Sequence, residues 1–211
     1  ELKIMAYTEN QIYLASRSPR RRELLKQIGI KHSVLLMRET MTRSVDIDET
    51  PNVEESPADY VYRMAHTKAD AGWDRLLQRK LPVLPILVAD TIVALDGCIL
   101  GKPRDAAHAE EMLLSLSGRT HQVLTAIALS IQGVVKHRLS ITTVRFREIG
   151  KREIQACIKG GEAHDKAGAY AIQGLAAAFI VDIYGSYSGV VGLPLFETAQ
   201  LLEESGIVLF S

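Results

Sequence analysis

Apolar and polar positions alternate along the first half of the chain in a way that predicts short strands and amphipathic helices. The apolar run over residues 12–15 predicts a buried strand. A helix is predicted over residues 19–28, because Ser18 suits the N-cap, Pro19 the first helical position and Gly29 the helix stop. The pattern then predicts a strand over residues 31–37, a polar acidic loop over 38–57 and a long helix that ends near residue 78.

The second half of the chain is richer in strand patterns. An apolar run over residues 83–95 predicts a buried strand interrupted at Asp90, and Asp96-Gly97 indicates a turn. Two long strand-like runs joined at Gln132-Gly133 predict a hairpin of residues 122–131 and 134–146. The other predicted elements are a strand over 98–100, helices over 105–116, 151–159 and 194–204, a buried strand over 179–184, and turns at 185–187 and 189–194. This order of elements predicts an α/β fold with a mixed sheet.

Composition narrows the class of protein. The chain has 211 residues, of which 47% are hydrophobic, so one large domain or two lobes that share a core are expected. This hydrophobic content excludes a mainly disordered chain. The longest apolar run, residues 81–95, is shorter than the ~20 residues of a membrane-spanning helix and contains two prolines and an aspartate, so no membrane association is expected.

Charge and cysteine content exclude further classes. The 25 basic residues are balanced by 25 acidic ones, and general nucleic-acid binding is not expected without a basic excess. Cys98 and Cys157 are too few for a disulfide scaffold or a zinc site, and they are expected to act as small hydrophobic residues. The first residues lack the pattern of a secretory signal, so a cytoplasmic location is the default expectation.

The segment from Ser16 to Arg22 has the features of an anion-binding site. It places four arginines and two serines, Ser16 and Ser18, where a predicted strand leads into a helix. The free backbone N–H groups of a helix start favour negative charge, and guanidinium groups form forked hydrogen bonds to phosphate oxygens. The alternative is a capped surface helix with solvated arginines. The Gly-rich pattern of a P-loop is not found here.

Asp90 lies inside an otherwise apolar predicted strand. Burial of an unpaired carboxylate is costly, so this residue is a candidate for function. The alternative is an aspartate at a strand break that binds nearby backbone N–H groups.

Isolated charged residues are candidates for a functional site only if the fold brings them together. Lys68 and Lys102 are expected to be solvated unless they reach the same pocket. The acidic loop before the long helix is either solvated, or it supplies a carboxylate that meets Asp90 at a hard cation such as Mg²⁺. Its acidic residues are Asp46, Asp48, Glu49, Glu54 and Glu55.

A late segment over residues 165–174 is rich in small residues, which allow close approach of the backbone to a ligand. Its Gln173 offers both a donor and an acceptor that suit a base edge. The six histidines show no His-Glu-x-x-His spacing, and the Gly-x-Ser-x-Gly elbow of serine hydrolases is not found in the sequence.

Taken in order, these segments resemble the Maf family of nucleotide pyrophosphatases. The resemblance covers residues 12–202 and depends on the ordered set of motifs. The matching segments are Ser16 to Arg21, Glu55-Ser56-Pro57 with Tyr60, Val61, Arg63 and Lys68, Ala89-Asp90-Thr91, Gly101-Lys102-Pro103, Leu116 to Arg119 with His121, Asp165 to Gly174, Gly185-Ser186-Tyr187 and Val191 to Leu195.

The resemblance implies a fold like that of the inosine triphosphate pyrophosphatases, with an elongated mixed sheet, flanking helices and two lobes around a central cleft. It implies a single domain over residues 12–211, preceded by an extension over residues 1–11 that is disordered or foreign to the domain. It also implies a cytoplasmic homodimer that hydrolyses a nucleoside triphosphate to the monophosphate and pyrophosphate with Mg²⁺ or Mn²⁺. Family members are associated with arrest of septum formation.

The resemblance also assigns roles to residues. It implies that Asp90 is the base and that Asp90 and Glu49 hold the metal. It further implies that Lys68 and Lys102 belong to the catalytic centre. Phosphate and base contacts are expected from Ser16, Ser18, Arg20, Arg21, Thr91 and Gln173.

Three positions indicate the branch of the family. The branch that hydrolyses dTTP and UTP carries Arg, Thr and Gln where this chain has Arg20, Thr91 and Gln173, whereas the branch that prefers 7-methyl-GTP carries Trp, Gln and Glu. The chain departs from the family pattern at Arg17, where a small residue is common, and in a longer loop over residues 36–45. Two alternatives stay open: another nucleotide in the same pocket, such as 7-methyl-GTP or a modified pyrimidine, and a non-catalytic regulator of division.

Overall fold

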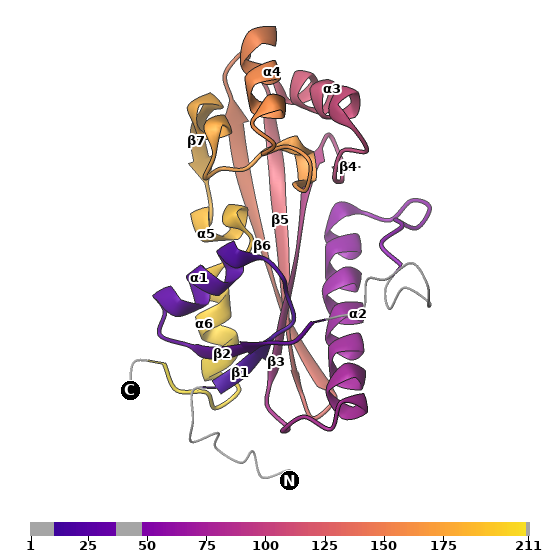
Figure 1. The fold of residues 1–211 in the computed structure, drawn as a ribbon, viewed down its shortest axis with the longest axis vertical. Coiled ribbons are helices and arrows are strands. Elements are labelled where there is room, and N and C mark those ends of the chain that lie inside the picture. The colour runs from indigo at the N-terminus through magenta and orange to yellow at the C-terminus, as the bar shows by residue number, and fades with distance from the viewer. Residues whose placement is uncertain (1–10, 37–47, 210–211) are drawn as a thin grey trace.

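A mixed seven-stranded sheet forms the centre of the structure, a computed structural model that describes residues 11–36 and 48–209. The strand order is β2-β1-β3-β5-β6-β7, and the short strand β4 also pairs with β3 (Figure 1). β1 runs parallel to β2 and β3, whereas every other pairing is antiparallel. The strands are β1 (Gln11–Leu14), β2 (Lys31–Val34), β3 (Ile86–Leu95), β4 (Cys98–Leu100), β5 (Thr120–Ile131), β6 (Val134–Phe146) and β7 (Ile180–Tyr184).

The helices begin where the sequence supplies caps. Ser18, Ser56 and Asp105 accept a hydrogen bond from the backbone N–H three residues on, and proline follows each of the two serines. The helices are α1 (Pro19–Gln27), α2 (Pro57–Gln78), α3 (Ala106–Leu116), α4 (Lys151–Lys159), α5 (Tyr187–Val191) and α6 (Leu195–Glu203), with 3₁₀ turns η1 (Ala167–Ala169) and η2 (Leu175–Phe179).

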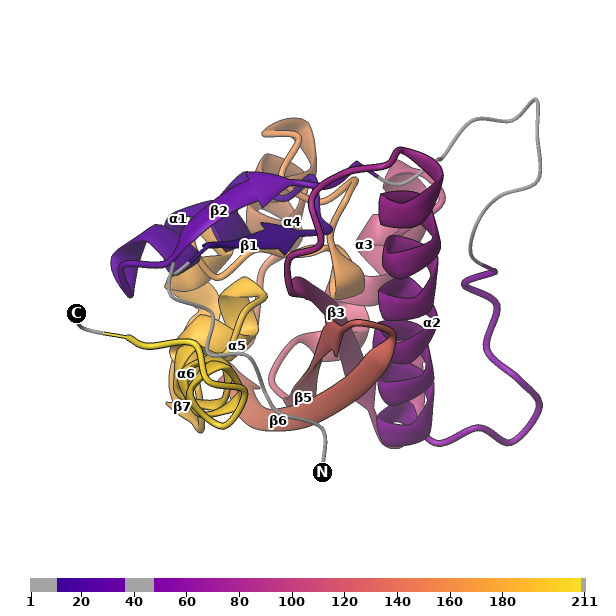
Figure 2. The ribbon, with the colours of Figure 1, turned by 90° about the horizontal axis from the view of Figure 1, so that it is seen from below.

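The core has three parts. On one face of β3 and β5, the buried side of α2 packs against alternate strand residues such as Val88 and Ile92. On the other face, α1 and α6 pack against Leu87 and Ala89. At the far end of the β5–β6 hairpin, α3 and α4 cover a third cluster (Figure 1), and the view from below shows α2 and α6 on opposite sides of the sheet (Figure 2). The predicted mixed sheet with flanking helices is confirmed.

Several predicted elements differ from the structure. β3 is continuous through Asp90, which pairs with Ala126 of β5, so the predicted interruption is wrong. The strand tolerates this carboxylate because Lys68 of α2 binds it. The predicted turn at 189–194 overlaps the short helix α5, whose N-cap Ser186 accepts from the N–H of Gly189. β7, predicted as buried, is an exposed strand at the end of the sheet.

The boundaries at the chain start also shift slightly. β1 begins at Gln11, within the extension predicted over residues 1–11, and the rest of that extension lies outside the described residues. β2 ends at Val34, and the predicted strand end at residue 37, the acidic residue Asp46 and most of the loop over 36–45 also lie outside them. Within the described residues, no helix combines the length and apolar character of a membrane-spanning segment.

His121, at the start of β5, gives the fold an acid-sensitive point. Its side chain is 2% exposed, its Nε2 lies 2.8 Å from the Tyr170 hydroxyl, and its Nδ1 is buried without a hydrogen-bond partner among the described residues. Burial lowers the pKa of His121 from 6.5 to about 4. Between these values the unfolded chain binds a proton that the folded chain does not, so stability falls as the pH falls.

We therefore expect the free energy of unfolding to decrease by about 3 kcal/mol from pH 7 to pH 4 through this residue alone. Urea unfolding over this range would measure it. The variant His121→Gln should lose this part of the slope, whereas His164→Gln, which alters an exposed histidine, should keep it. An unchanged slope in His121→Gln would contradict the assignment.

Candidate active site

The middle of β3 has one open edge. β1 pairs with β3 at Ile86 and Leu87, and β4 pairs with its other end at Val93 to Leu95. Between them, residues 88–92 are paired on the β5 side, and no described strand covers their other edge. Ligands of α/β proteins often bind where strands end at such a break. Asp90 and Thr91 lie in this interval and point to opposite faces of the sheet because strand side chains alternate.

Three charged side chains meet on the α2 face of this interval. The Lys68 ammonium lies 2.5 Å from Asp90 Oδ1 and 2.9 Å from Glu49 Oε1. The side chains of Lys68 and Asp90 are only 20% and 13% exposed, whereas Glu49 is 52% exposed. Three residues far apart in the sequence therefore form one half-buried cluster, as the family resemblance implies.

The cluster is electrostatically coupled. Burial lowers the pKa of Lys68, but the charges of Asp90 and Glu49 outweigh burial and hold this pKa above its ordinary value. Burial raises the pKa of Glu49, yet Lys68 and then Lys102 outweigh it, so the Glu49 pKa lies below its ordinary value. Lys102, exposed after β4, is thus close enough to act on the same group.

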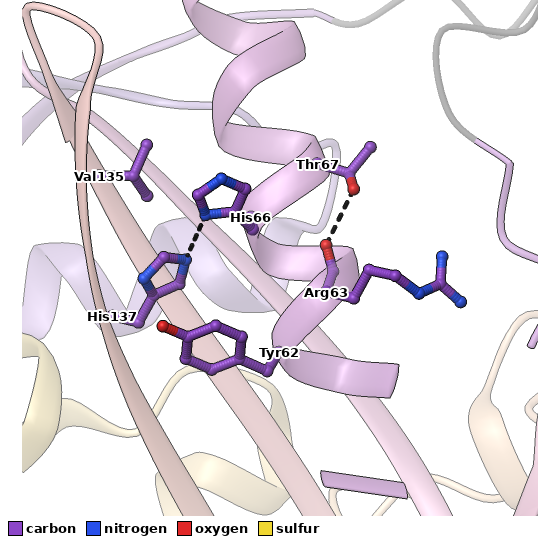
Figure 3. A pocket seen from close by; sticks show the side chains of 6 residues that line it. All are labelled: Tyr62, Arg63, His66, Thr67, Val135 and His137. Atoms are coloured by element: carbon purple, nitrogen blue, oxygen red, sulfur yellow. Dashed lines mark hydrogen bonds between the residues drawn. The ribbon is translucent and has the colours of Figure 1, made fainter. Parts of the chain in front are cut away.

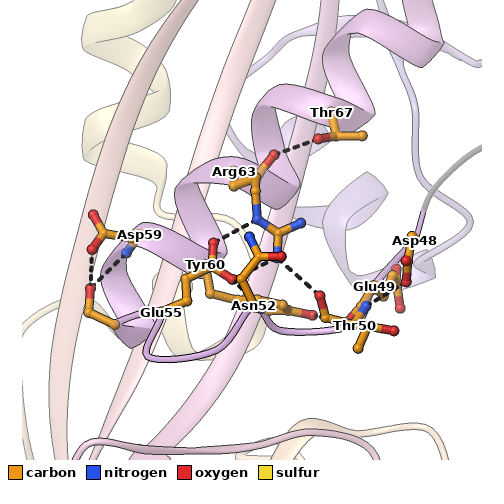
Figure 4. A network of polar contacts seen from close by, with 10 residues as sticks. Asp48, Glu49, Thr50, Asn52, Glu55, Asp59, Tyr60, Arg63 and Thr67 are labelled. Carbon is orange, nitrogen blue, oxygen red and sulfur yellow. Dashed lines mark hydrogen bonds and ion pairs between the residues drawn. The ribbon is translucent and has the colours of Figure 1, made fainter.

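Two side chains from the first turns of α2 hold the segment that carries Glu49 (Figure 4). The Tyr60 hydroxyl donates to the Glu49 carbonyl at 2.8 Å, and Arg63 Nη2 donates to the Thr50 carbonyl at 3.1 Å. Arg63 is itself fixed by two 2.6 Å hydrogen bonds to the Glu55 carboxylate. These contacts fix the backbone on which Glu49 reaches Lys68.

The donor set suits a hard divalent cation with few protein ligands. Glu49 and Asp90 both point at one cationic position, which the Lys68 ammonium takes in this structure. The described residues contain no group of three or more histidine, cysteine or carboxylate side chains arranged around a metal. Mg²⁺ is commonly held by one or two carboxylates together with substrate phosphates and water, so the two carboxylates fit it.

On the opposite face, Arg21 connects the helix start to β3. Its Nε donates to the Gly192 carbonyl at 2.7 Å, its Nη1 to Ser16 Oγ at 3.3 Å and its Nη2 to Thr91 Oγ1 at 3.2 Å. Burial lowers the pKa of Arg21, Asp90 opposes this, and Arg20 adds to it. The guanidinium is therefore engaged by protein acceptors and is not a free surface charge.

The hydrogen bonds of Thr91 follow from its neighbours. Thr125 Oγ1 donates its proton to the Gly189 carbonyl at 2.8 Å, so the 3.0 Å contact between the two threonine hydroxyls needs Thr91 as donor. Thr91 also accepts from Arg21. Its hydroxyl proton is therefore used inside the protein, and Thr91 is left with acceptor capacity alone.

The remaining predicted residues lie around the start of α1. Ser16 Oγ accepts from the Ser18 N–H at 3.2 Å, and Ser18 is the N-cap of α1. Arg20 and the exposed Gln173 line one small cavity of about 30 Å³ together with Lys166 and Tyr170. Arg20 also helps to lower the pKa of Asp165, after Lys166 and against burial.

The predicted residues thus form three groups: Asp90, Lys68, Glu49 and Lys102; then Arg21, Thr91, Ser16 and Ser18; and then Arg20 with Gln173. Gln173 and Thr91, both expected from the sequence to contact the base, share no hydrogen bond among the described residues and belong to different groups. The structure adds Tyr60, Arg63 and Lys166, to which no role was given. The sequence offered a signal for Tyr60 and Arg63, because the acidic Glu55 lies eight positions before the basic Arg63 at the start of the long predicted helix. Lys166 lies in the small-residue segment over residues 165–174.

Comparison with known proteins decides the family. The family model described as Maf-like protein matches residues 11–205. The chain belongs to the Maf family. The resemblance on which the site residues were chosen is therefore confirmed at the level of the family.

Curated relatives extend over nearly the whole of this Maf chain. A protein of Nitrosomonas europaea named dTTP/UTP pyrophosphatase is 71% identical over 95% of the chain and 97% of its own length. A protein of Nitrosospira multiformis with the same name is 56% identical over 98% of the chain and all of its own length. Among solved structures, the Staphylococcus aureus Ham1 protein matches with a TM-score of 0.45 and 18% identity, over 64% of the chain and 71% of its own.

Proposed function

We propose that this Maf chain is a nucleoside triphosphate pyrophosphatase that hydrolyses dTTP and UTP to the monophosphate and pyrophosphate. The observation that carries the proposal is the cluster of Asp90, Lys68 and Glu49 at the uncovered part of β3, beside an arginine-rich helix start. The relatives that are 71% and 56% identical carry this activity in their names and support the choice of substrate.

Asp90 is the proposed base. Among the described residues, the Asp90 carboxylate has one hydrogen bond, from Lys68, and so keeps acceptor capacity for the proton of an attacking water. Water then adds at the α-phosphorus, the bond to the β-phosphate oxygen breaks, and pyrophosphate leaves with the electron pair. Lys68 orients Asp90 and supplies positive charge beside the reacting phosphates.

The phosphates need further cations, because a triphosphate carries about four negative charges. Lys102, in the segment after β4, is coupled to Glu49 of the cluster, and Arg20 of α1 lines the small cavity with Gln173; we propose that both bind phosphate oxygens. Ser16, Ser18 and the backbone N–H groups of the helix start complete the cradle. Arg21 contributes its charge and holds this cradle to Thr91 and Gly192.

Glu49 and Asp90 are the proposed ligands of Mg²⁺ or Mn²⁺. When bound there, the cation neutralises phosphate charge and polarises the phosphoryl oxygens. Tyr60 and Arg63 position Glu49 for this role by holding its backbone and that of Thr50.

The remaining acceptor capacity of the Thr91 hydroxyl supports selection of uracil and thymine over cytosine. Uracil and thymine carry an N3–H donor, whereas cytosine has an acceptor at that atom. A hydroxyl whose proton is already used by Thr125 pairs with the donor and leaves the acceptor unmatched. Gln173, on the cavity that Arg20 lines, is the second proposed base contact.

A panel of nucleoside triphosphates tests the function. Pyrophosphate release from dTTP, UTP, CTP, ATP and 7-methyl-GTP is measured with Mg²⁺, with Mn²⁺ and with a chelator. The expected result is a kcat/KM that is highest for dTTP and UTP and is lost with the chelator. Preference for 7-methyl-GTP would place the chain in the other branch, and release from none of them would favour a non-catalytic division regulator.

We also propose that the protein is a cytoplasmic homodimer, with its nucleotide substrates in the same compartment. Support for association comes from large exposed side chains near the uncovered strand β7, which are Val181, Tyr184, Tyr187 and Phe196 at 50%, 84%, 53% and 70% exposure. Light scattering on the purified chain would give its mass, and a monomer at micromolar concentration would contradict the dimer.

A further inference from the structure

A pair of histidines lies between α2 and β6, and neither member belongs to the proposed catalytic cluster. His66 of α2 and His137 of β6 approach each other with 3.0 Å between His66 Nδ1 and His137 Nε2 (Figure 3). Their rings are nearly parallel, with 17° between the planes, and Tyr62 stacks on His137 at 4.3 Å. The pair is therefore held in place by two elements and a third ring.

A carboxylate lies beside the His66 nitrogen that does not face His137. Asp70 lies one turn after His66 on α2, with Oδ2 3.4 Å from His66 Nε2, and so favours the proton on that nitrogen. His66 Nδ1 then presents a lone pair toward His137, and His137 Nε2 donates into it. A carboxylate behind a histidine is also the common arrangement around metal-binding imidazoles.

The pair borders open space. It lines a hollow of about 430 Å³ whose other lining residues are Tyr62, Arg63, Thr67 and Val135. The Arg63 guanidinium points away from the two rings (Figure 3), and the Glu55 carboxylate compensates its charge. Water molecules can therefore reach the two imidazoles from one side.

The geometry points to a second metal site: we propose that His66 and His137 bind one divalent late transition metal ion, of the class of Ni²⁺, Cu²⁺ or Zn²⁺. With metal–nitrogen bonds of ~2.05 Å, two nitrogens 3.0 Å apart subtend about 94° at the metal. This angle is close to that between neighbouring ligands of tetragonal or octahedral sites, which suits Cu²⁺ and Ni²⁺.

The chain supplies only part of the coordination. The described residues contain no cluster of three or more histidine, cysteine or carboxylate ligands, so water in the hollow completes the shell. On binding, the proton of His137 moves from Nε2 to Nδ1 and both rings stay neutral. Because His66 is two residues before Lys68, the bound ion ties the helix that carries Lys68 to β6.

The site differs in chemistry from the carboxylate pair of Glu49 and Asp90. Imidazole nitrogens select late transition metals, whereas Mg²⁺ prefers oxygen ligands. An excess of Mg²⁺ should therefore leave binding at the histidines unchanged. This separates the two sites in one experiment.

Calorimetric titration of the untagged full chain with Ni²⁺, in the presence of excess Mg²⁺ and without nucleotide, tests the proposal. One equivalent should bind at pH 7.5. His66→Gln and His137→Gln should each weaken it ~10-fold or more, and Asp70→Asn should weaken it by a smaller factor. His164→Gln, at an exposed histidine, serves as the matched control and should bind like the unaltered chain.

A second measurement covers variants that fold poorly. Ni²⁺ is paramagnetic, so in the unaltered chain it should broaden the imidazole resonances of His66 and His137 before those of the other histidines. Binding that is equal in all four variants, or broadening that begins at other histidines, would overturn the proposal. The proposal would also be overturned if the resonances of the two histidines shifted with pH between 5 and 7 but did not change when Ni²⁺ was added. Both readouts are independent of hydrolysis, so their outcome stands whether or not dTTP is a substrate.

Discussion

Asp90→Asn lowers the turnover of dTTP by ~10²–10⁴-fold, the weight of a general base in hydrolysis. The amide keeps the shape of the side chain but cannot accept the proton of water. It also removes the negative charge that Lys68 faces at 2.5 Å. We expect KM to change less than kcat, because phosphate binding depends mainly on Arg20, Lys102 and the helix start.

The control for this prediction is Asp96→Asn in the turn after β3. Asp96 is 69% exposed and pairs with Arg119 on the surface, so its replacement should leave turnover unchanged. Steady-state pyrophosphate release at saturating Mg²⁺ measures both variants, and their melting temperatures show whether they are folded. A folded Asp90→Asn variant with near-normal turnover would show that the base lies elsewhere.

Lys68→Met is expected to have the second largest effect, a loss of ~10²–10³-fold in kcat/KM. Methionine fills the same space but leaves Glu49 and Asp90 facing each other without a cation between them. Phosphate binding then lacks one positive charge, and the two carboxylates repel both each other and the substrate. Higher concentrations of Mg²⁺ should restore part of the activity, because the metal can take the place between the carboxylates.

Lys151→Met provides the comparison, since Lys151 is an exposed residue at the start of α4. It should keep full activity at every Mg²⁺ concentration. Initial rates over a series of dTTP and Mg²⁺ concentrations separate the two variants. If Lys68→Met lost no more activity than Lys151→Met, Lys68 would be a structural partner of Asp90 only.

Local sequence was sufficient for most helices. Caps at Ser18, Ser56 and Asp105 act on the adjacent backbone, so their effect depends on a few neighbouring residues. The hairpin at Gln132-Gly133 is equally local, since both residues adopt the positive φ angles that such a tight turn requires. The pairing order of the strands could not be read in this way.

Two predictions failed because a distant partner decided the outcome. Asp90 was expected to break its strand, but Lys68, 22 positions earlier, binds its carboxylate and the strand continues. The segment before α6 was expected to be turns, but it forms the short helix α5, which hydrogen bonds from Thr125 of β5 to Gly189 and between Thr142 of β6 and Ser186 hold against the sheet. Sequence periodicity does not contain such contacts.

In the candidate site, too, local sequence determines one part and tertiary structure the other. Motif order was enough to place the chain in the Maf family and to name the charged residues, because these residue types and spacings are local properties of the chain. The assembly of Asp90, Lys68 and Glu49 on one face of β3, with Thr91 and Arg21 on the other, depends on tertiary structure. The hydrogen bonds of Tyr60 and Arg63 to the Glu49 and Thr50 carbonyls, and the contact between His66 and His137, depend on it as well. Each needs side chains from separate elements, and only packing of the folded chain sets their distances.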